Sequence, residues 1–163
     1  MAPQDTLLSI AEISIGLAGF SGLVAAFVQP VGHKWREDQK ARIAILIILS
    51  FAMMVCSLAP YALSGIDDSA AFVWGVPMVV FSILSLSILG HWVTVRHRRK
   101  FTLQFPLIST PIIGVAATLQ IATLLSGLGL IIPYSPTVFV LGFLFVLIFG
   151  ANVFMALLYS IWK

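Results

Sequence analysis

One carboxylate stands alone inside a long apolar stretch, and it is the residue of this chain best suited to chemistry. Glu12 lies in the apolar run from Leu7 to Val28. A charge at mid-bilayer costs about 2.5–3.5 kcal/mol on insertion scales, so ionisable groups within spanning helices usually face protein or water. Glu12 could hold a proton or a cation there, or it could be a neutral carboxyl that pins its helix to a neighbour. The sequence leaves both interpretations open.

Two amide side chains lie deep in later apolar runs. Gln120 and Asn152 would be costly against lipid, so we expect them to point inward and to form hydrogen bonds across helices. We expect Glu12 in the outer half of the membrane, Gln120 near its middle and Asn152 slightly towards the inside. We therefore predict Glu12, Gln120 and Asn152 as candidates for an ion pathway, with interhelical packing as the alternative for the two amides.

Small residues surround Glu12 on its predicted helix. At about 100° per residue, Gly16 and Gly19 lie close to the azimuth of Glu12, and other small residues recur every four positions nearby. The predicted interface for helix packing or oligomerisation consists of Ser14, Gly16, Ala18, Gly19, Gly22 and Ala26. Such residues allow a second helix to approach closely. We expect this helix to be surrounded by protein, at the centre of the bundle or of an oligomer.

Five apolar segments must position these residues. The chain is 60% hydrophobic and 9% charged, whereas soluble domains are roughly a quarter charged. The segments lack the alternation of barrel strands, and a spanning helix needs about 20 mostly apolar residues. We predict an all-α membrane protein, with residues 1–163 forming one bundle of five transmembrane helices. Their predicted ranges are about 7–28, 43–64, 71–95, 107–132 and 137–161.

Nine Lys and Arg residues against six Asp and Glu give a net charge of +3, and the nine basic residues can all be placed on one side of a membrane. Short basic loops stay cytoplasmic, which predicts an outside N-terminus and a cytoplasmic C-terminus in a plasma or inner membrane. Asp67 and Asp68 then lie outside. The basic loops could also attract anionic lipid headgroups, and topology explains their charge without nucleic acid. The headgroup candidates are Lys34, Arg36, Lys40, Arg42, Arg96, Arg98, Arg99 and Lys100.

Recognisable catalytic and cofactor motifs are missing from the sequence. It contains no HExxH, no Walker loop and no GxGxxG after a strand. Cys56 is the single cysteine, and His91 is the one histidine within a predicted span. We therefore expect no enzyme activity, no metal and no cofactor.

Three functions stay open at this stage. The first is an ion- or proton-conducting homo-oligomer centred on Glu12. The second is a non-catalytic accessory or scaffold subunit of a larger membrane complex, because the chain has no soluble domain and only 163 residues. The third is a membrane-perturbing effector gated through the basic loops, which no particular residue selects.

Overall fold

The computed structural model describes residues 3–28, 36–99 and 106–161, and within these ranges it is helical apart from short turns, with no strand. This confirms the predicted all-α class. Lys34 and Lys100 lie outside the described residues. The helices are α1 (Pro3–Val28), α2 (Glu37–Ser64), η2 (Ala71–Gly75), α3 (Val76–Arg99), α4 (Pro106–Gly127) and α5 (Pro136–Ile161).

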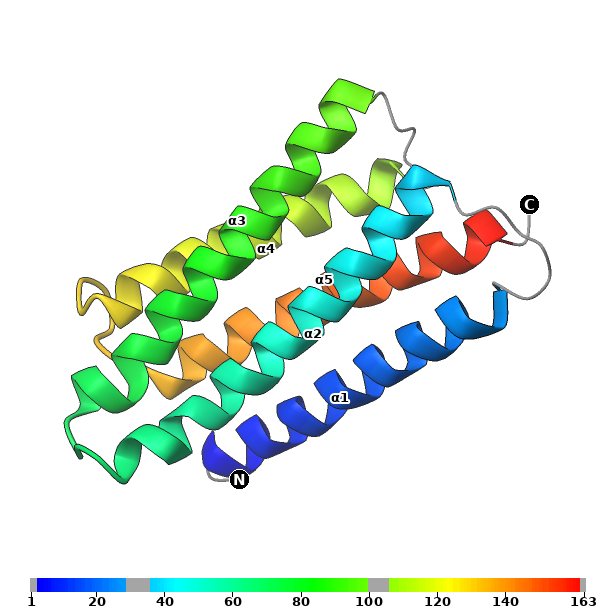
Figure 1. The fold of residues 1–163 in the computed structure, drawn as a ribbon. Helices are drawn as coiled ribbons and strands as arrows, with labels where there is room; N and C mark the ends of the chain where they lie inside the picture. Colours follow the sequence, from blue (N-terminus) through cyan, green and yellow to red (C-terminus); the bar gives the residue numbers. More distant parts are fainter. Residues whose placement is uncertain (1–2, 29–35, 100–105, 162–163) are drawn as a thin grey trace.

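Successive helices run in opposite directions along the bundle (Figure 1). The start of α1 lies at the same end as the connections from α2 to α3 and from α4 to α5, and the end of α5 lies at the other. α2 packs against α1, α3 and α5, while α4 packs against α3 and α5. α1 contacts α2 and, less extensively, α5, so it lies at the edge of the bundle.

Large aromatic side chains of α3 and α5 meet in the core. Phe81 of α3 and Phe139 and Phe143 of α5 are fully buried. The ring centroids of Phe81 and Phe143 lie 4.2 Å apart, and those of Phe139 and Phe143 lie 4.5 Å apart. Aromatic side chains bury the most apolar area per residue. The centre of the bundle is therefore filled by bulky side chains and not by the small residues of α1.

Four helices contain stretches long and apolar enough to cross a membrane. These stretches are Asp5–Val24, Gln39–Ser64, Ala71–Thr94 and Pro136–Tyr159. In α4 the described apolar stretch, Pro111–Gly127, is shorter. The fold thus has the four long apolar helices of a multi-pass membrane protein.

The predicted helix over 107–132 ends at Gly127, and its last residues form a turn instead. Gly129 has a φ of 74°. Its N–H donates to the Ser126 carbonyl, and the Leu130 N–H donates to the Leu125 carbonyl at 2.9 Å. This pair of bonds is the Schellman motif, which ends a helix at a left-handed residue. The apolar residues that follow, Leu128 to Ile132, concealed this end from a prediction based on hydropathy.

Candidate functional site

Glu12 faces away from the bundle. The side of α1 that packs against the bundle includes Leu7, Ile10 and Ser14, which are all nearly or fully buried. The Ser14 hydroxyl donates to the Ile10 carbonyl at 2.7 Å, so its polarity is satisfied within the helix. The Glu12 side chain is exposed on another side of α1. Within one copy of the chain, the carboxylate of this apolar helix therefore lies on the surface of the bundle.

The small residues nearest Glu12 face the same open space. A Cβ atom added to Gly16, Gly19 or Gly22 would meet no atom within 4 Å. Ala26 is exposed as well. We call Glu12, Gly16, Gly19, Gly22 and Ala26 together the α1 outer face.

Large apolar side chains share the α1 outer face with these small residues. Leu8, Ile15 and Leu23 are about half exposed. The expectation that α1 is central is thus wrong within one copy of the chain, because α2 and α5 each pack against three other long helices, whereas α1 packs mainly against α2. A central place for α1 in an oligomer stays a prediction.

A groove runs beside this face, between α1 and α2. Its volume is about 470 Å³. The residues that line it are Ser14, Ile15, Ala18, Gly19, Ile47, Ser50, Phe51 and Met54. Ser50 is 1% exposed, and its hydroxyl has no hydrogen-bond partner among the described residues. Ser14, Ala18 and Gly19 were in the predicted interface, whereas Ser50 was not, and its only signal was a hydroxyl within an apolar run.

Gln120 lies inside the bundle, as its polarity predicted. It is 1% exposed, and its Nε2 donates to the Gly142 carbonyl of α5 at 3.0 Å. Asn152 is half-buried on α5. The structure therefore does not bring the three candidate pathway residues together in one copy, because Glu12 faces outward while Gln120 lies between α4 and α5. Their joint role as a pathway stays a prediction.

The basic residues gather at one end of the bundle. Arg36, Lys40 and Arg42 are at the beginning of α2, and Arg96, Arg98 and Arg99 are at the end of α3. These two helix ends lie at the same end of the bundle, opposite the α2–α3 turn with its two aspartates (Figure 1). Arg42 Nη1 donates to the Ala156 carbonyl at 2.8 Å and so joins α2 to α5. The basic residues in the described ranges thus lie at one end of the bundle, as the sequence predicted, while the orientation in the membrane and headgroup binding stay predictions.

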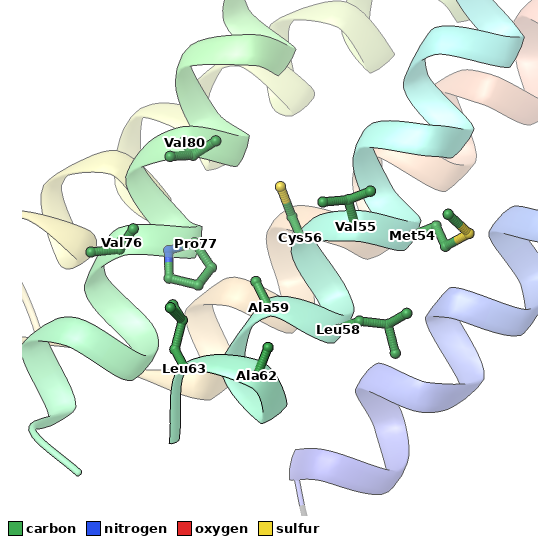
Figure 2. A pocket seen from close by; sticks show the side chains of 10 residues that line it. All are labelled: Met54, Val55, Cys56, Leu58, Ala59, Ala62, Leu63, Val76, Pro77 and Val80. Carbon is green, nitrogen blue, oxygen red and sulfur yellow. The ribbon is translucent and has the colours of Figure 1, made fainter. Parts of the chain in front are cut away.

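A second groove opens between α2 and α3 and has a different character. It has a volume of about 490 Å³, and Figure 2 shows α2 residues on one side and α3 residues on the other. Its lining is Met54, Val55, Cys56, Leu58, Ala59, Ala62, Leu63, Val76, Pro77 and Val80. None of these side chains carries a charge. The groove suits hydrocarbon chains but contains no side chain that would orient a polar ligand, so the α1 outer face is the better candidate site.

A metal centre has no support from the geometry. Among the residues that the structure describes, no group of three or more His, Cys, Asp or Glu side chains could hold an ion. His91 is exposed on α3 and Cys56 is buried in α2. The chemistry available to the α1 outer face is therefore that of a single carboxylate on an apolar helix.

These features define the protein as an integral membrane protein with apolar helices of spanning length. No protein-family profile, curated protein or solved structure matches the chain. Its function is accordingly inferred from its own residues.

Proposed function

We propose that the protein is a non-catalytic, homo-oligomeric membrane protein of a plasma or inner membrane, in which Glu12 lines a path for protons or cations between the copies. One observation carries this proposal, namely that Glu12 is exposed on the outside of an apolar helix. At a rise of about 1.5 Å per residue, Glu12 lies about 10 Å along the helix from Asp5, where the apolar stretch begins. A carboxylate at this depth calls for protein or water beside it rather than acyl chains.

The glycines beside Glu12 indicate that a second helix could pack closely on this face. Gly16, Gly19 and Gly22 leave the backbone of α1 bare on this face, and bare backbone is what allows two spanning helices to approach closely. A second copy of α1 would bring a second Glu12 to the same contact. Repetition by symmetry would then place carboxylates around an axis, as in the rings that select cations in channels.

The alternative is an accessory subunit that docks on a different membrane protein. The groove between α1 and α2 favours this second candidate, because it is large and lies next to the α1 outer face. The buried Ser50 hydroxyl could donate there to a group on a partner helix. In this case Glu12 would pair with the partner and would conduct nothing.

Proton and cation flux into proteoliposomes tests the first function. We expect flux above that of protein-free vesicles for the natural chain, and a fall to the protein-free level for Glu12→Gln. Asp5→Asn is the matched control, because it removes the same charge from the first turn of the same helix. It should leave the flux unchanged. Equal flux in natural chain, Glu12→Gln and empty vesicles would reject conduction.

Purification from native membranes separates the two candidates. A homogeneous assembly of this chain alone supports the homo-oligomer. A different membrane protein present at fixed stoichiometry supports the accessory subunit, particularly if Ser50→Ala or Glu12→Gln weakens its retention.

A further inference from the structure

Several hydroxyl groups in the described helices are satisfied within their own helix. The hydroxyls of Ser14, Ser21 and Thr123 donate to the carbonyl one turn earlier, at 2.7 to 2.8 Å. This local bond is the usual solution in an apolar helix, where water is scarce. Ser82 and Ser85 of α3 are different, because both are buried and neither hydroxyl has a hydrogen-bond partner among the described residues.

The side-chain amide of Gln120 on α4 also has a buried atom without a hydrogen-bond partner among the described residues. Its Nε2 donates to the Gly142 carbonyl. This bond fixes the orientation of the amide, because a flipped group would point its oxygen at another oxygen. Oε1 is consequently turned away from Gly142, and it too has no partner among the described residues. A buried acceptor without a partner is costly, so something beyond these side chains is expected to satisfy it.

Ser85 and Gln120 line the same small cavity, where α2, α3, α4 and α5 meet. Its volume is about 10 Å³. The other residues of the lining are Leu49, Ile88, Leu89, Ala116, Val146 and Phe149. A single buried water needs roughly 10–15 Å³ and two to four polar partners. The cavity is thus of the right size for one water, and its two polar side chains are those that have an unpartnered atom.

We propose that this cavity binds one ordered water, which donates to Gln120 Oε1 and accepts from the Ser85 hydroxyl. The cavity is too small for an organic ligand. A hard cation takes six or more oxygen ligands, whereas the side chains of this lining supply two oxygens. The water would link α3 to α4, and the Gln120 bond to Gly142 would extend the link to α5. This site does not depend on Glu12 or on the proposed function.

The direct test is a structure of the full chain, crystallised from lipid at a resolution that shows ordered waters. We expect one density peak within about 2.7–3.2 Å of both Gln120 Oε1 and Ser85 Oγ. A direct bond between these two atoms, or no peak beside them, would overturn the proposal. This test needs no variant, so it does not depend on whether altered chains fold.

A double-mutant cycle tests the same link in solution. Ser85→Ala and Gln120→Met should each raise the unfolding equilibrium constant, and the double variant should raise it about three- to tenfold less than the product of the two. Ser82→Ala is the matched control, because Ser82 is equally buried and unpartnered on the same helix but does not line the cavity. Its effect should multiply with that of Gln120→Met. If the effects of Ser85 and Gln120 also multiply, no water joins them.

Discussion

Glycines lie on helix surfaces in two parts of this bundle, and their surroundings differ. Where η2 and α3 meet α4, a Cβ atom on Gly75 would lie 2.9 Å from the Gly127 carbonyl oxygen. Where α4 meets α5, a Cβ atom on Gly142 would lie 2.7 Å from Thr123 Oγ1. On α1, by contrast, a Cβ atom on Gly16, Gly19 or Gly22 would meet nothing within 4 Å. Close helix approach is therefore used at Gly75, Gly127 and Gly142, whereas the three α1 glycines are open, as are Gly90 on α3 and Gly114 on α4.

This difference bears on what covers α1 in a membrane. Lipid chains do not require glycine beside them, and glycine in a helix interior costs about 0.8–1.0 kcal/mol relative to alanine. At Gly75 and Gly127 the close contact of two backbones offsets this cost. On α1 no contact within the chain does so. Because Gly90 and Gly114 are open as well, it is the combination of open glycines with the exposed Glu12 that supports the proposal that the α1 outer face meets protein outside this copy.

The largest effect is expected where the glycines are already packed. A Cβ atom on Gly127 would lie 2.9 Å from Met78 Cβ and 3.0 Å from Val79 Cγ2. Gly127→Ala should lower the free energy of unfolding by about 1–3 kcal/mol, because overpacking shifts side chains and backbone. Unfolding in mixed detergent micelles, with the chain held monomeric, measures this change.

Gly114→Ala is the matched control on the same helix. A Cβ atom on Gly114 would meet nothing within 4 Å, so the better helix propensity of alanine should leave stability equal or slightly higher. Comparable losses for the two variants would show that helix packing does not distinguish the two positions.

A smaller effect is expected on α1, and it should appear in assembly rather than in folding. Gly19→Leu adds a large side chain to the α1 outer face, at a position where a Cβ atom meets nothing within 4 Å. Its stability as a monomer should be equal or slightly higher, because leucine is a better helix former than glycine, whereas self-association should weaken by about tenfold or more, which corresponds to about 1.4 kcal/mol. Fluorescence energy transfer between labelled copies in vesicles measures the association.

Gly90→Leu controls for bulk added elsewhere on the surface. Gly90 lies on α3, is exposed, and has the same open space around it. It should leave self-association unchanged. If Gly90→Leu weakens association and Gly19→Leu does not, the copies meet through α3 and the proposed role of α1 is lost.

The sequence was sufficient to predict an all-helical chain with apolar helices of spanning length and the inward position of Gln120. Long apolar runs specify spanning helices by length alone. An amide side chain in such a run is costly against lipid, so it is expected to point into the bundle and bond to another helix. It was also sufficient to place Glu12, Gly16 and Gly19 on one side of α1. It could not say which side of α1 packs within the chain, because small residues allow close packing without specifying the partner. In the structure the packed side of α1 carries Leu7, Ile10 and Ser14.

The end of α4 was missed for a different reason. Gly129 and Pro133 are both signals of a helix end, but the apolar residues between them continued the hydropathy pattern of the span. In the structure Ser126 makes the turn specific, since its hydroxyl donates to the Ile132 carbonyl at 2.7 Å and its carbonyl accepts from the Tyr134 N–H at 3.0 Å. Bonds between residues six and eight positions apart cannot be deduced from hydropathy.

The smallest effect concerns this turn and tests how strongly the packed side of the bundle holds its backbone. Ile132 has a φ of 39°, which is unfavourable for a β-branched residue. Such strain costs about 1–3 kcal/mol and persists only where the surroundings enforce it. Two residues later in the turn, the Tyr134 ring packs against η2. A Cβ atom added to Gly75 would lie only 3.2 Å from this ring. The close approach of η2 to the turn thus fixes the strained conformation.

Ile132→Gly should release this strain while keeping the carbonyl that Ser126 binds. Glycine brings its own entropic cost of about 0.5–1 kcal/mol, so from the middle of the two ranges the net expectation is a gain in the free energy of unfolding of about 1 kcal/mol. Ile131→Gly is the control, because Ile131 is similarly exposed and its φ is not positive; it should be destabilising by the entropic cost alone. The opposite signs of two adjacent, chemically identical substitutions would attribute the gain to the backbone. A loss of stability at both positions would mean that the turn is not held under strain. The α3–α4–α5 side of the bundle would then constrain its connecting turns no more than the α1 side does.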